Sequence, residues 1–241
     1  MFIFDKHPVQ HNIPWLAIVC LTSLVACSGD DNSYFPLSEG RTWHYDISRT
    51  TMDGTFQQKQ IFHSLPGIEW QSGTAVPLVS AGGAHYLYQE NEQGTELVAV
   101  KARDANEYTI ADEAFRLLPD EITPGATWRQ SEHTQVLENT GSPWETLFRI
   151  VEPVSIEYVV ESNDASIRVA AGEFRDCIKV LGHGEANVDV GNYIGRTLIT
   201  IEIENWYAKG VGLVRSTRRE ITTSEALDYG ELRYELEEIS H

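Results

Sequence analysis

The sequence predicts an all-β protein, built as a single strongly curved antiparallel sheet or an open half-barrel with at most one or two short helices. Three observations predict this class. Short segments alternate apolar and polar residues, turn residues separate them at intervals of about ten residues, and no sustained helical period appears. Hydrophobic residues make up 41% and charged residues 22% of the 241 residues, which is ordinary for a packed globular chain.

The first 26 residues are predicted to form a secretory signal peptide. Their apolar stretch, Ile13–Ala26, has about fourteen residues and is shorter than the roughly twenty that a membrane-spanning helix needs. Leu24-Val25-Ala26-Cys27 resembles the lipobox of bacterial lipoproteins. The resemblance implies cleavage before Cys27, a diacylglycerol on its sulfur and an acyl chain such as palmitate on its amine. Cys27 is therefore the predicted lipidation site, and its acyl chains anchor the protein to a membrane.

Residues 27–33, the lipidated cysteine and a short polar run, are predicted to tether the folded body, 34–241, close to its membrane. The six residues after Cys27 reach at most about 20 Å. Ser28 rather than Asp follows the cysteine, and in enterobacterial lipoproteins this favours sorting to the outer membrane. We therefore expect a protein of the bacterial cell envelope that faces the periplasm, with the outer membrane favoured over the inner one.

Strand alternation runs along most of the body. The clearest segments are Trp43–Ile47, Val154–Val160, Thr197–Tyr207 and Leu232–Leu236, and weaker ones are Gln57–Leu65, Ala75–Ser80, His85–Glu90, Glu96–Lys101 and Thr146–Glu152. Apolar residues at every second position predict one buried face and one solvated face. One helix is predicted near Ala111–Leu118, where Pro119 would end it.

Two turns in the chain are alike. Pro36–Trp43 and Pro119–Trp128 both end in Gly-x-Thr-Trp, so each predicts a turn that feeds a strand beginning with a large indole. This repeated motif has two interpretations. Either two similar halves, 34–118 and 119–241, form one continuous sheet, or a common turn-to-strand solution occurs twice.

Two further segments carry a resemblance of their own. Ala171–Val180 (AGEFRDCIKV) and Trp206–Val214 (WYAKGVGLV), together with Tyr34–Leu37, Gly40 and Trp43, are similar to a signature of exported bacterial proteins of unknown function. The resemblance implies a β-rich envelope domain, often lipidated, without an established activity or catalytic residues.

Charge and cysteine content restrict the partners and the compartment. Eighteen basic and 36 acidic residues give a net charge of −18, which opposes binding to phosphate backbones, so no nucleic acid partner is expected. Cys20 leaves with the signal peptide and Cys27 is lipidated. Cys177 is then the remaining cysteine of the mature chain, and we expect it to be buried as a small hydrophobic side chain.

The sequence predicts no catalytic residue, no metal site and no cofactor, because no zinc, nucleophile or phosphate-binding motif occurs. Five residues are candidates to face a ligand: Trp43, Trp128, Trp206, Tyr207 and His183. The aromatic rings either line a groove or pack in the core. His183 lies near Glu185, and Gly182 and Gly184 flank it.

The leading hypothesis is a lipid-anchored, non-enzymatic envelope protein that acts as a binding or assembly module for an unknown envelope protein or lipid. One alternative is a carrier of lipid or lipoprotein acyl chains in a concave apolar groove, which a large apolar cavity would favour. The other is an envelope hydrolase, which requires a histidine and a carboxylate within hydrogen-bonding reach in a cleft.

Overall fold

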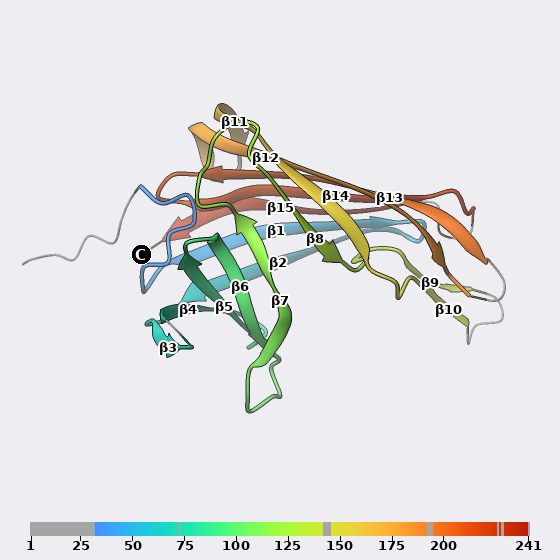
Figure 1. Cartoon of the computed structure of the whole chain (residues 1–241), viewed down its shortest axis with the longest axis horizontal. Helices are drawn as coiled ribbons and strands as arrows, with labels where there is room; N and C mark the ends of the chain where they lie inside the picture. The colour runs from blue at the N-terminus through green and yellow to red at the C-terminus, as the bar shows by residue number, and fades with distance from the viewer. Residues whose placement is uncertain are drawn as a thin grey trace, which may run out of the picture.

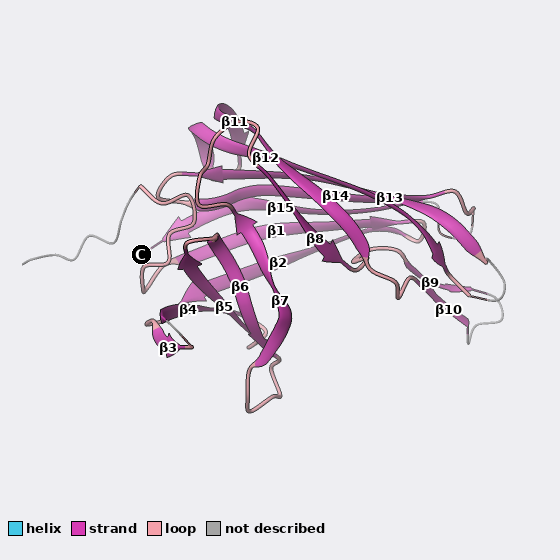
Figure 2. Cartoon of the chain, viewed as in Figure 1, coloured by secondary structure: helices cyan, strands magenta, loops and turns pink. Residues whose placement is uncertain are grey.

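The computed structural model of the chain describes residues 32–71, 73–141, 146–191, 195–225, 227 and 229–240. Within these ranges every regular element is a β-strand, which confirms the predicted all-β class (Figure 2). The predicted signal peptide 1–26 and the lipidation site Cys27 lie outside the described residues. Within the same ranges, no helix is long and apolar enough to cross a bilayer.

The described residues contain fifteen strands. They are β1 (Thr42–Thr51), β2 (Gly54–Ser64), β3 (Ile68–Trp70), β4 (Gly73–Ser80), β5 (His85–Asn91), β6 (Gly94–Lys101), β7 (Thr109–Leu118), β8 (Thr127–Glu132), β9 (Glu138–Gly141), β10 (Thr146–Arg149), β11 (Val154–Val169), β12 (Gly172–Asp189), β13 (Arg196–Ala208), β14 (Gly212–Thr222) and β15 (Tyr229–Ser240). Every segment for which the sequence predicts a strand contains one.

One 13-stranded antiparallel sheet forms the body, and it does not close into a barrel. Its order is β7-β6-β5-β4-β2-β1-β15-β14-β13-β12-β11-β8, with β3 paired to β4, while β9 and β10 form a separate hairpin. The long strands β11–β15, β1 and β2 make a broad curved layer, and β4–β7 lie beneath one end of it (Figure 1). The first and last strands, β1 and β15, pair in the middle of the sheet.

The two edges of the sheet, β7 and β8, follow each other in the chain. A connection of residues 119–126 joins them, so the sheet must curve until its edges approach. The backbone N–H of Arg116 on β7 donates a hydrogen bond of 3.0 Å to the side-chain oxygen of Gln130 on β8. A side-chain contact thus connects the edges, and the curved sheet surrounds a concave space.

The alternation of the strands divides the sheet into a packed concave face and a polar outer face, as predicted. On β13, Ile199, Ile201 and Ile203 are buried, whereas Glu202 is exposed. Trp43, Tyr45 and Ile47 on β1 point to the same concave side. Successive side chains of a strand point to opposite faces, so burial of one face selects every second residue.

The helix predicted near Ala111–Leu118 is wrong, because this segment is strand β7. It pairs antiparallel with β6 from Thr109 to Leu118, and Leu118 is buried. Helix propensity amounts to only a few tenths of a kcal/mol per residue, so the unpaired edge of β6 and the burial of Leu118 outweigh it.

Both Gly-x-Thr-Trp segments form the predicted turn into a strand. Gly40 and Gly125 have φ values of 85° and 91°, a left-handed conformation that suits glycine. β1 and β8 each begin at the following threonine, and Trp43 and Trp128 are buried on the concave face. This shared geometry is compatible with both interpretations of the repeated motif, two similar halves or one turn-to-strand solution that occurs twice.

Candidate functional site

A cavity of about 270 Å³ lies on the concave face, between the long layer and the strands β4 and β5. Its lining is mostly aromatic and aliphatic: Phe35, Pro36, Trp43, Tyr45, Phe62, Leu78, Tyr86, Tyr88, Gly212, Leu213, Ser216 and Tyr234. The cavity is partly open to solvent, so it is a pocket of the concave surface and not a void inside the core. A concave apolar pocket with a few polar groups is the usual form of a small-molecule site.

Aromatic contacts hold the cavity wall in shape. The rings of Phe35 and Tyr88 lie 4.9 Å apart, and Phe62 contacts Tyr45 at 6.0 Å and Tyr86 at 5.9 Å with their planes steeply inclined. Edge-to-face pairs of this kind add about 0.5–1.5 kcal/mol to the burial of the rings. The wall is therefore built before any ligand arrives.

Two polar groups of the wall are bonded to the protein itself. The indole N–H of Trp43 donates to the carbonyl of Val211, and the hydroxyl of Tyr45 donates to the carbonyl of Leu213, both at 2.7 Å. Both acceptors lie next to Gly212, whose φ of 97° places the chain in the left-handed region. These bonds fix the orientation of the two rings against the start of β14.

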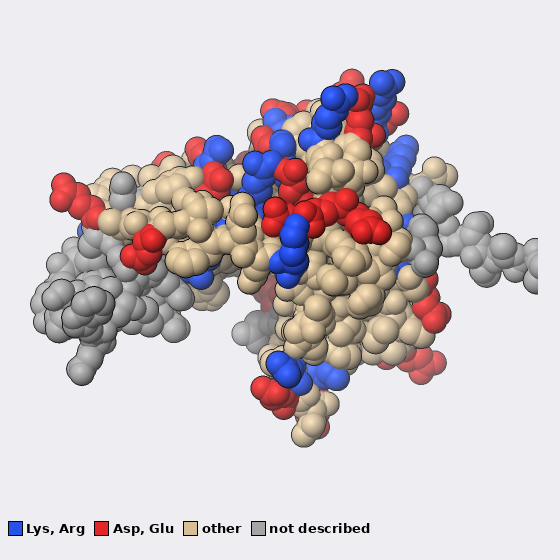
Figure 3. Space-filling view, turned by 180° about the vertical axis from the view of Figure 1, so that it is seen from behind, with Lys and Arg blue, Asp and Glu red and all other residues tan. Residues whose placement is uncertain are grey.

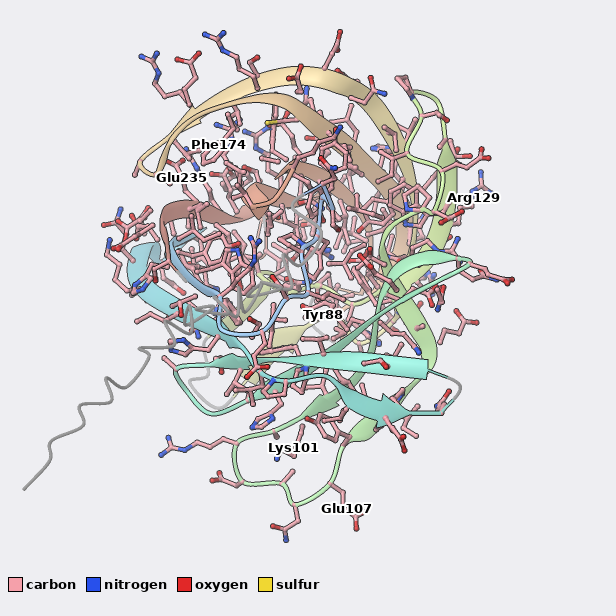
Figure 4. All side chains as sticks on the ribbon, turned by 90° about the vertical axis from the view of Figure 1, so that its left-hand side faces the viewer. Tyr88, Lys101, Glu107, Arg129, Phe174 and Glu235 are labelled. Carbon is pink, nitrogen blue, oxygen red and sulfur yellow. The ribbon has the colours of Figure 1, made fainter. Side chains whose placement is uncertain are left out.

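Three other hydroxyls of the wall are not bonded in this way. Within the described part of the chain, no protein group hydrogen bonds to the hydroxyl of Tyr86, Tyr88 or Tyr234. Tyr88 lies between the long layer and the strands below it (Figure 4). Burial, followed by the neighbouring phenols of Tyr86 and Tyr234, raises the pKa of Tyr88, so this hydroxyl remains a neutral donor.

The segment before β1 closes one end of the cavity. The carbonyl of Ser33 accepts a hydrogen bond of 2.8 Å from the N–H of Gly210, and the hydroxyl of Tyr34 donates to the carbonyl of Asp176 at 3.1 Å. Phe35 then enters the wall. The three segments that resemble exported proteins are far apart in sequence, and they meet at this end of the molecule.

A second, smaller cavity of about 160 Å³ continues the concave space and shares Leu213, Ser216 and Tyr234 with the first. Its wall includes Tyr207 and a group of polar side chains: Glu132, Gln135, Asn205 and Arg218. The concave space therefore passes from an aromatic end to an ionic end.

A buried ionic cluster occupies that second end. Arg218 donates to Glu132 at 2.6 Å, to Glu220 at 2.7 Å and to the carbonyl of His133 at 2.9 Å. Glu220 also accepts the backbone N–H groups of residues 135–137 at 2.8–3.0 Å. Tyr158 donates its hydroxyl to Glu132. The cluster thereby fixes the loop between β8 and β9 against the sheet.

Charge pairing dominates the electrostatics of this cluster. Burial opposes the charged form of Arg218, but the carboxylates of Glu220 and Glu132 raise its pKa. Sequence analysis missed the cluster. Strand alternation does place Arg218 and Glu220 on one face of β14, but only the sheet order brings Glu132 from β8 to them.

Of the five residues predicted to face a ligand, two line a cavity and three do not. Trp43 lines the larger cavity and Tyr207 the smaller one. Trp128 stacks on the ring of Tyr158, with centroids 5.1 Å apart and planes 8° apart. Trp206 lies beside the cations of Lys179 and Arg215, outside both cavities. His183 is exposed on the outer face.

The glycines that flank His183 have a packing role. A Cβ at Gly182 would lie 2.8 Å from the ring of Tyr158, and one at Gly184 would lie 2.6 Å from the carbonyl oxygen of Ser155. Real Cβ atoms do not approach other atoms so closely. Both glycines therefore let β11 and its aromatic ring lie directly against β12.

His183 borders a groove of about 460 Å³ on the outer face, lined by side chains of both charges. The Nε2 atom of His183 lies 3.8 Å from Glu185, which is beyond hydrogen-bonding distance. In the same region Arg219 bonds to Glu231 at 2.9 Å. Basic and acidic side chains are interspersed on the surface seen in Figure 3. Exposed pairs of this kind contribute little to stability.

Cys177 is buried, as predicted. Burial, followed by the charge of Asp176, raises the pKa of its thiol to about 11. The thiolate is the reactive form of cysteine, so the environment of Cys177 keeps it unreactive at neutral pH.

No family model and no curated protein sequence matches the chain. Two solved structures are similar in arrangement. One, from Bacteroides fragilis, is provisionally described as an exported protein with a YmcC-like fold; it shares 15% identity over 86% of this chain and 98% of its own, with a TM-score of 0.37. The other, from Parabacteroides distasonis, is provisionally described as a lipoprotein, with 14% identity, the same coverage and a TM-score of 0.36.

Proposed function

We propose that this chain is a lipid-anchored, non-enzymatic binding module of the bacterial envelope, and that its ligand occupies the cavity on the concave face. The observation that carries the proposal is the aromatic cavity of about 270 Å³. An apolar ligand in this space would remove its own surface and that of the aromatic rings from water, which favours binding.

A second candidate function is a carrier of lipid or lipoprotein acyl chains. The apolar lining favours it, because Phe35, Phe62 and Leu78 offer hydrocarbon and ring surface to a chain. A carrier must also release its cargo. The two candidate functions therefore differ in whether the ligand is released. A carrier transfers the ligand between membranes, whereas a binding module retains it.

The hydrolase alternative finds less support. In the ranges that the structure describes, a histidine approaches a carboxylate at His183 and Glu185, and this pair is exposed on the outer face. Neither cavity is lined by a histidine. The cavity side chains suit binding better than acid–base chemistry.

The short tether supports exchange with the anchoring membrane. Ser33 is already hydrogen bonded to Gly210, and Phe35 and Pro36 line the cavity. The residues between a lipidated Cys27 and Ser33 span at most about 20 Å. The end of the cavity at Phe35 would then lie close to the bilayer.

The anchor and the cavity can be tested separately. Radiolabelled palmitate should be incorporated into the wild-type chain and should be absent from Cys27→Ala; equal incorporation in both would contradict the anchor.

For the cavity, the full-length protein is extracted with its membrane and analysed for bound lipid by mass spectrometry. Ser216→Phe fills the space between the two cavities and should lose the bound molecule. Thr217→Phe introduces the same side chain on the outer face and should keep the bound molecule. A wild-type protein without any bound molecule, or identical content in both variants, would contradict binding in the cavity.

A further inference from the structure

The cavity wall contains hydroxyl groups that can donate hydrogen bonds to a ligand. Apolar side chains surround these hydroxyls, so the wall suits a ligand that has both a hydrogen-bond acceptor and a hydrocarbon part. The hydroxyls of Tyr86, Tyr88 and Tyr234 have no protein partner in the described part of the chain. These three tyrosines are partly exposed, so a ligand acceptor would replace the water that otherwise bonds to their hydroxyls. Hydrocarbon surface from Phe62 and Leu78 lies in the same wall.

No positive charge is available to the ligand in either cavity. Among the described lining residues, Arg218 is the single cation. Each nitrogen of its guanidinium is bonded to the protein, Nη1 to Glu132, Nε to Glu220 and Nη2 to the carbonyl of His133. The carboxylate of Glu132 in the same wall and the net charge of −18 both oppose a ligand anion.

We infer that the cavity takes an acyl chain joined through an uncharged carbonyl group, as an ester or an amide, in preference to a free fatty acid. The carbonyl oxygen accepts hydrogen bonds from the hydroxyls of Tyr86, Tyr88 and Tyr234, and the hydrocarbon chain lies against Phe62 and Leu78. A carboxylate in the same position would be desolvated without a cation to pair with. This inference rests on the proposed function and narrows its ligand class.

The test compares three photoactivatable probes that carry the same diazirine-bearing chain. They are a monoacylglycerol, an N-acyl glycinamide and a fatty acid, which present an ester, an amide and a carboxylate. The full-length lipidated protein is reconstituted in phosphatidylcholine vesicles with equal membrane contents of each probe at pH 9. Mass spectrometry then quantifies labelling of the peptides that contain Tyr88 and Tyr234.

The ester, the amide or both should label these peptides at least about tenfold more than the fatty acid, because burial of an unpaired carboxylate is costly. The ratio between ester and amide identifies whether glycerolipid or N-acylated chains are preferred. Equal or stronger labelling by the fatty acid would overturn the inference while leaving apolar binding intact. Absence of labelling by all three probes would instead contradict the proposed function.

Tyr88→Phe removes one of the free hydroxyls and keeps its ring. It should lower labelling by the preferred ester or amide about fivefold, as expected for loss of one hydrogen bond, and leave labelling by the fatty acid nearly unchanged. The matched control is Tyr45→Phe, whose hydroxyl is already bonded to Leu213 and should matter little. Tyr234→Phe provides a second variant, so misfolding of one does not decide the result. Equal loss with Tyr45→Phe would contradict the assigned role of the free hydroxyls.

Discussion

The two ends of the concave space differ in how their polar groups are used. At the ionic end, Glu132, Arg218 and Glu220 are buried and bonded to one another and to the loop before β9. At the aromatic end, the hydroxyls of Tyr86 and Tyr88 bond to no protein group in the described ranges, and both residues line the cavity of about 270 Å³. Satisfied polar networks hold a structure in one arrangement, whereas the hydroxyls beside the larger cavity are the donors that the proposed ligand would use.

Under the proposed function, the ionic end stabilises the fold and the aromatic end binds the ligand. Substitutions at the ionic end should change the free energy of unfolding, and substitutions at the aromatic end should change ligand occupancy more than stability. The following changes test that division.

The largest effect is expected for Arg218→Met, which leaves Glu132 and Glu220 as uncompensated buried charges. Breaking a buried ion pair from one side costs about 3–5 kcal/mol. Arg219→Met is the matched control, since the neighbouring Arg219 pairs with Glu231 on the exposed face and should cost less than about 1 kcal/mol. Urea unfolding monitored by circular dichroism measures both values. Equal losses would mean that the ionic end has no special structural role.

The next effect compares one chemical change at the two ends. Tyr158→Phe removes the hydroxyl that donates to buried Glu132 and should cost about 1–3 kcal/mol. Tyr88→Phe removes a hydroxyl without a described protein partner and should change the unfolding free energy by less than about 0.5 kcal/mol. The same urea measurement applies. A greater loss for Tyr88→Phe than for Tyr158→Phe would reverse the assignment of the two ends.

A smaller effect should appear at alkaline pH. Burial, followed by the phenol of Tyr88, raises the pKa of Tyr207 in the folded protein. The folded state then holds this proton more tightly than the unfolded state. The associated stability is complete below the ordinary tyrosine pKa of about 10 and is lost as pH rises towards the folded pKa.

Between pH 8 and pH 11, the raised pKa of Tyr207 should therefore lower the free energy of unfolding by about 1.4 kcal/mol. Over the same interval, the free energy of unfolding of Tyr207→Phe should fall by about 1.4 kcal/mol less than that of the wild type. Phe35→Leu changes the wall without removing a titrating group, so its pH dependence should match the wild type. Urea titrations at the two pH values provide the measurement, and an unchanged slope in Tyr207→Phe would show that its phenol is solvated.

Much of the fold could be predicted from the sequence because strand alternation is a local property. Ile199, Ile201 and Ile203 share a face by spacing alone, and the structure buries all three. The glycine and proline residues before Trp43 and Trp128 likewise predicted the two turns. The helix predicted for Ala111–Leu118 was wrong because this segment pairs with β6, and local propensity does not report such a distant contact.

The candidate site was less accessible to sequence reasoning. Trp43 and Tyr207 were predicted to face a ligand from their aromatic rings, and they line the cavities. Trp128 and Trp206, predicted on the same grounds, and His183, predicted from its neighbour Glu185 and its flanking glycines, do not line either cavity. Which tyrosines converge depends on the order of the strands, which spacing along the chain does not encode. Tyr88 on β5 and Tyr234 on β15 meet only after the sheet has curved.

The pairing of β1 with β15 has a consequence for the order of assembly. The middle of the sheet joins segments from opposite ends of the described chain, as in the register of Trp43 with Ile239. Contacts between such distant segments form slowly, because a long loop must close before they contribute. A polypeptide that emerges amino terminus first from a translocation channel would lack the partner of its first strand until β15 had crossed. In such a passage the pairing of β1 with β15 would form last, after the rest of the sheet.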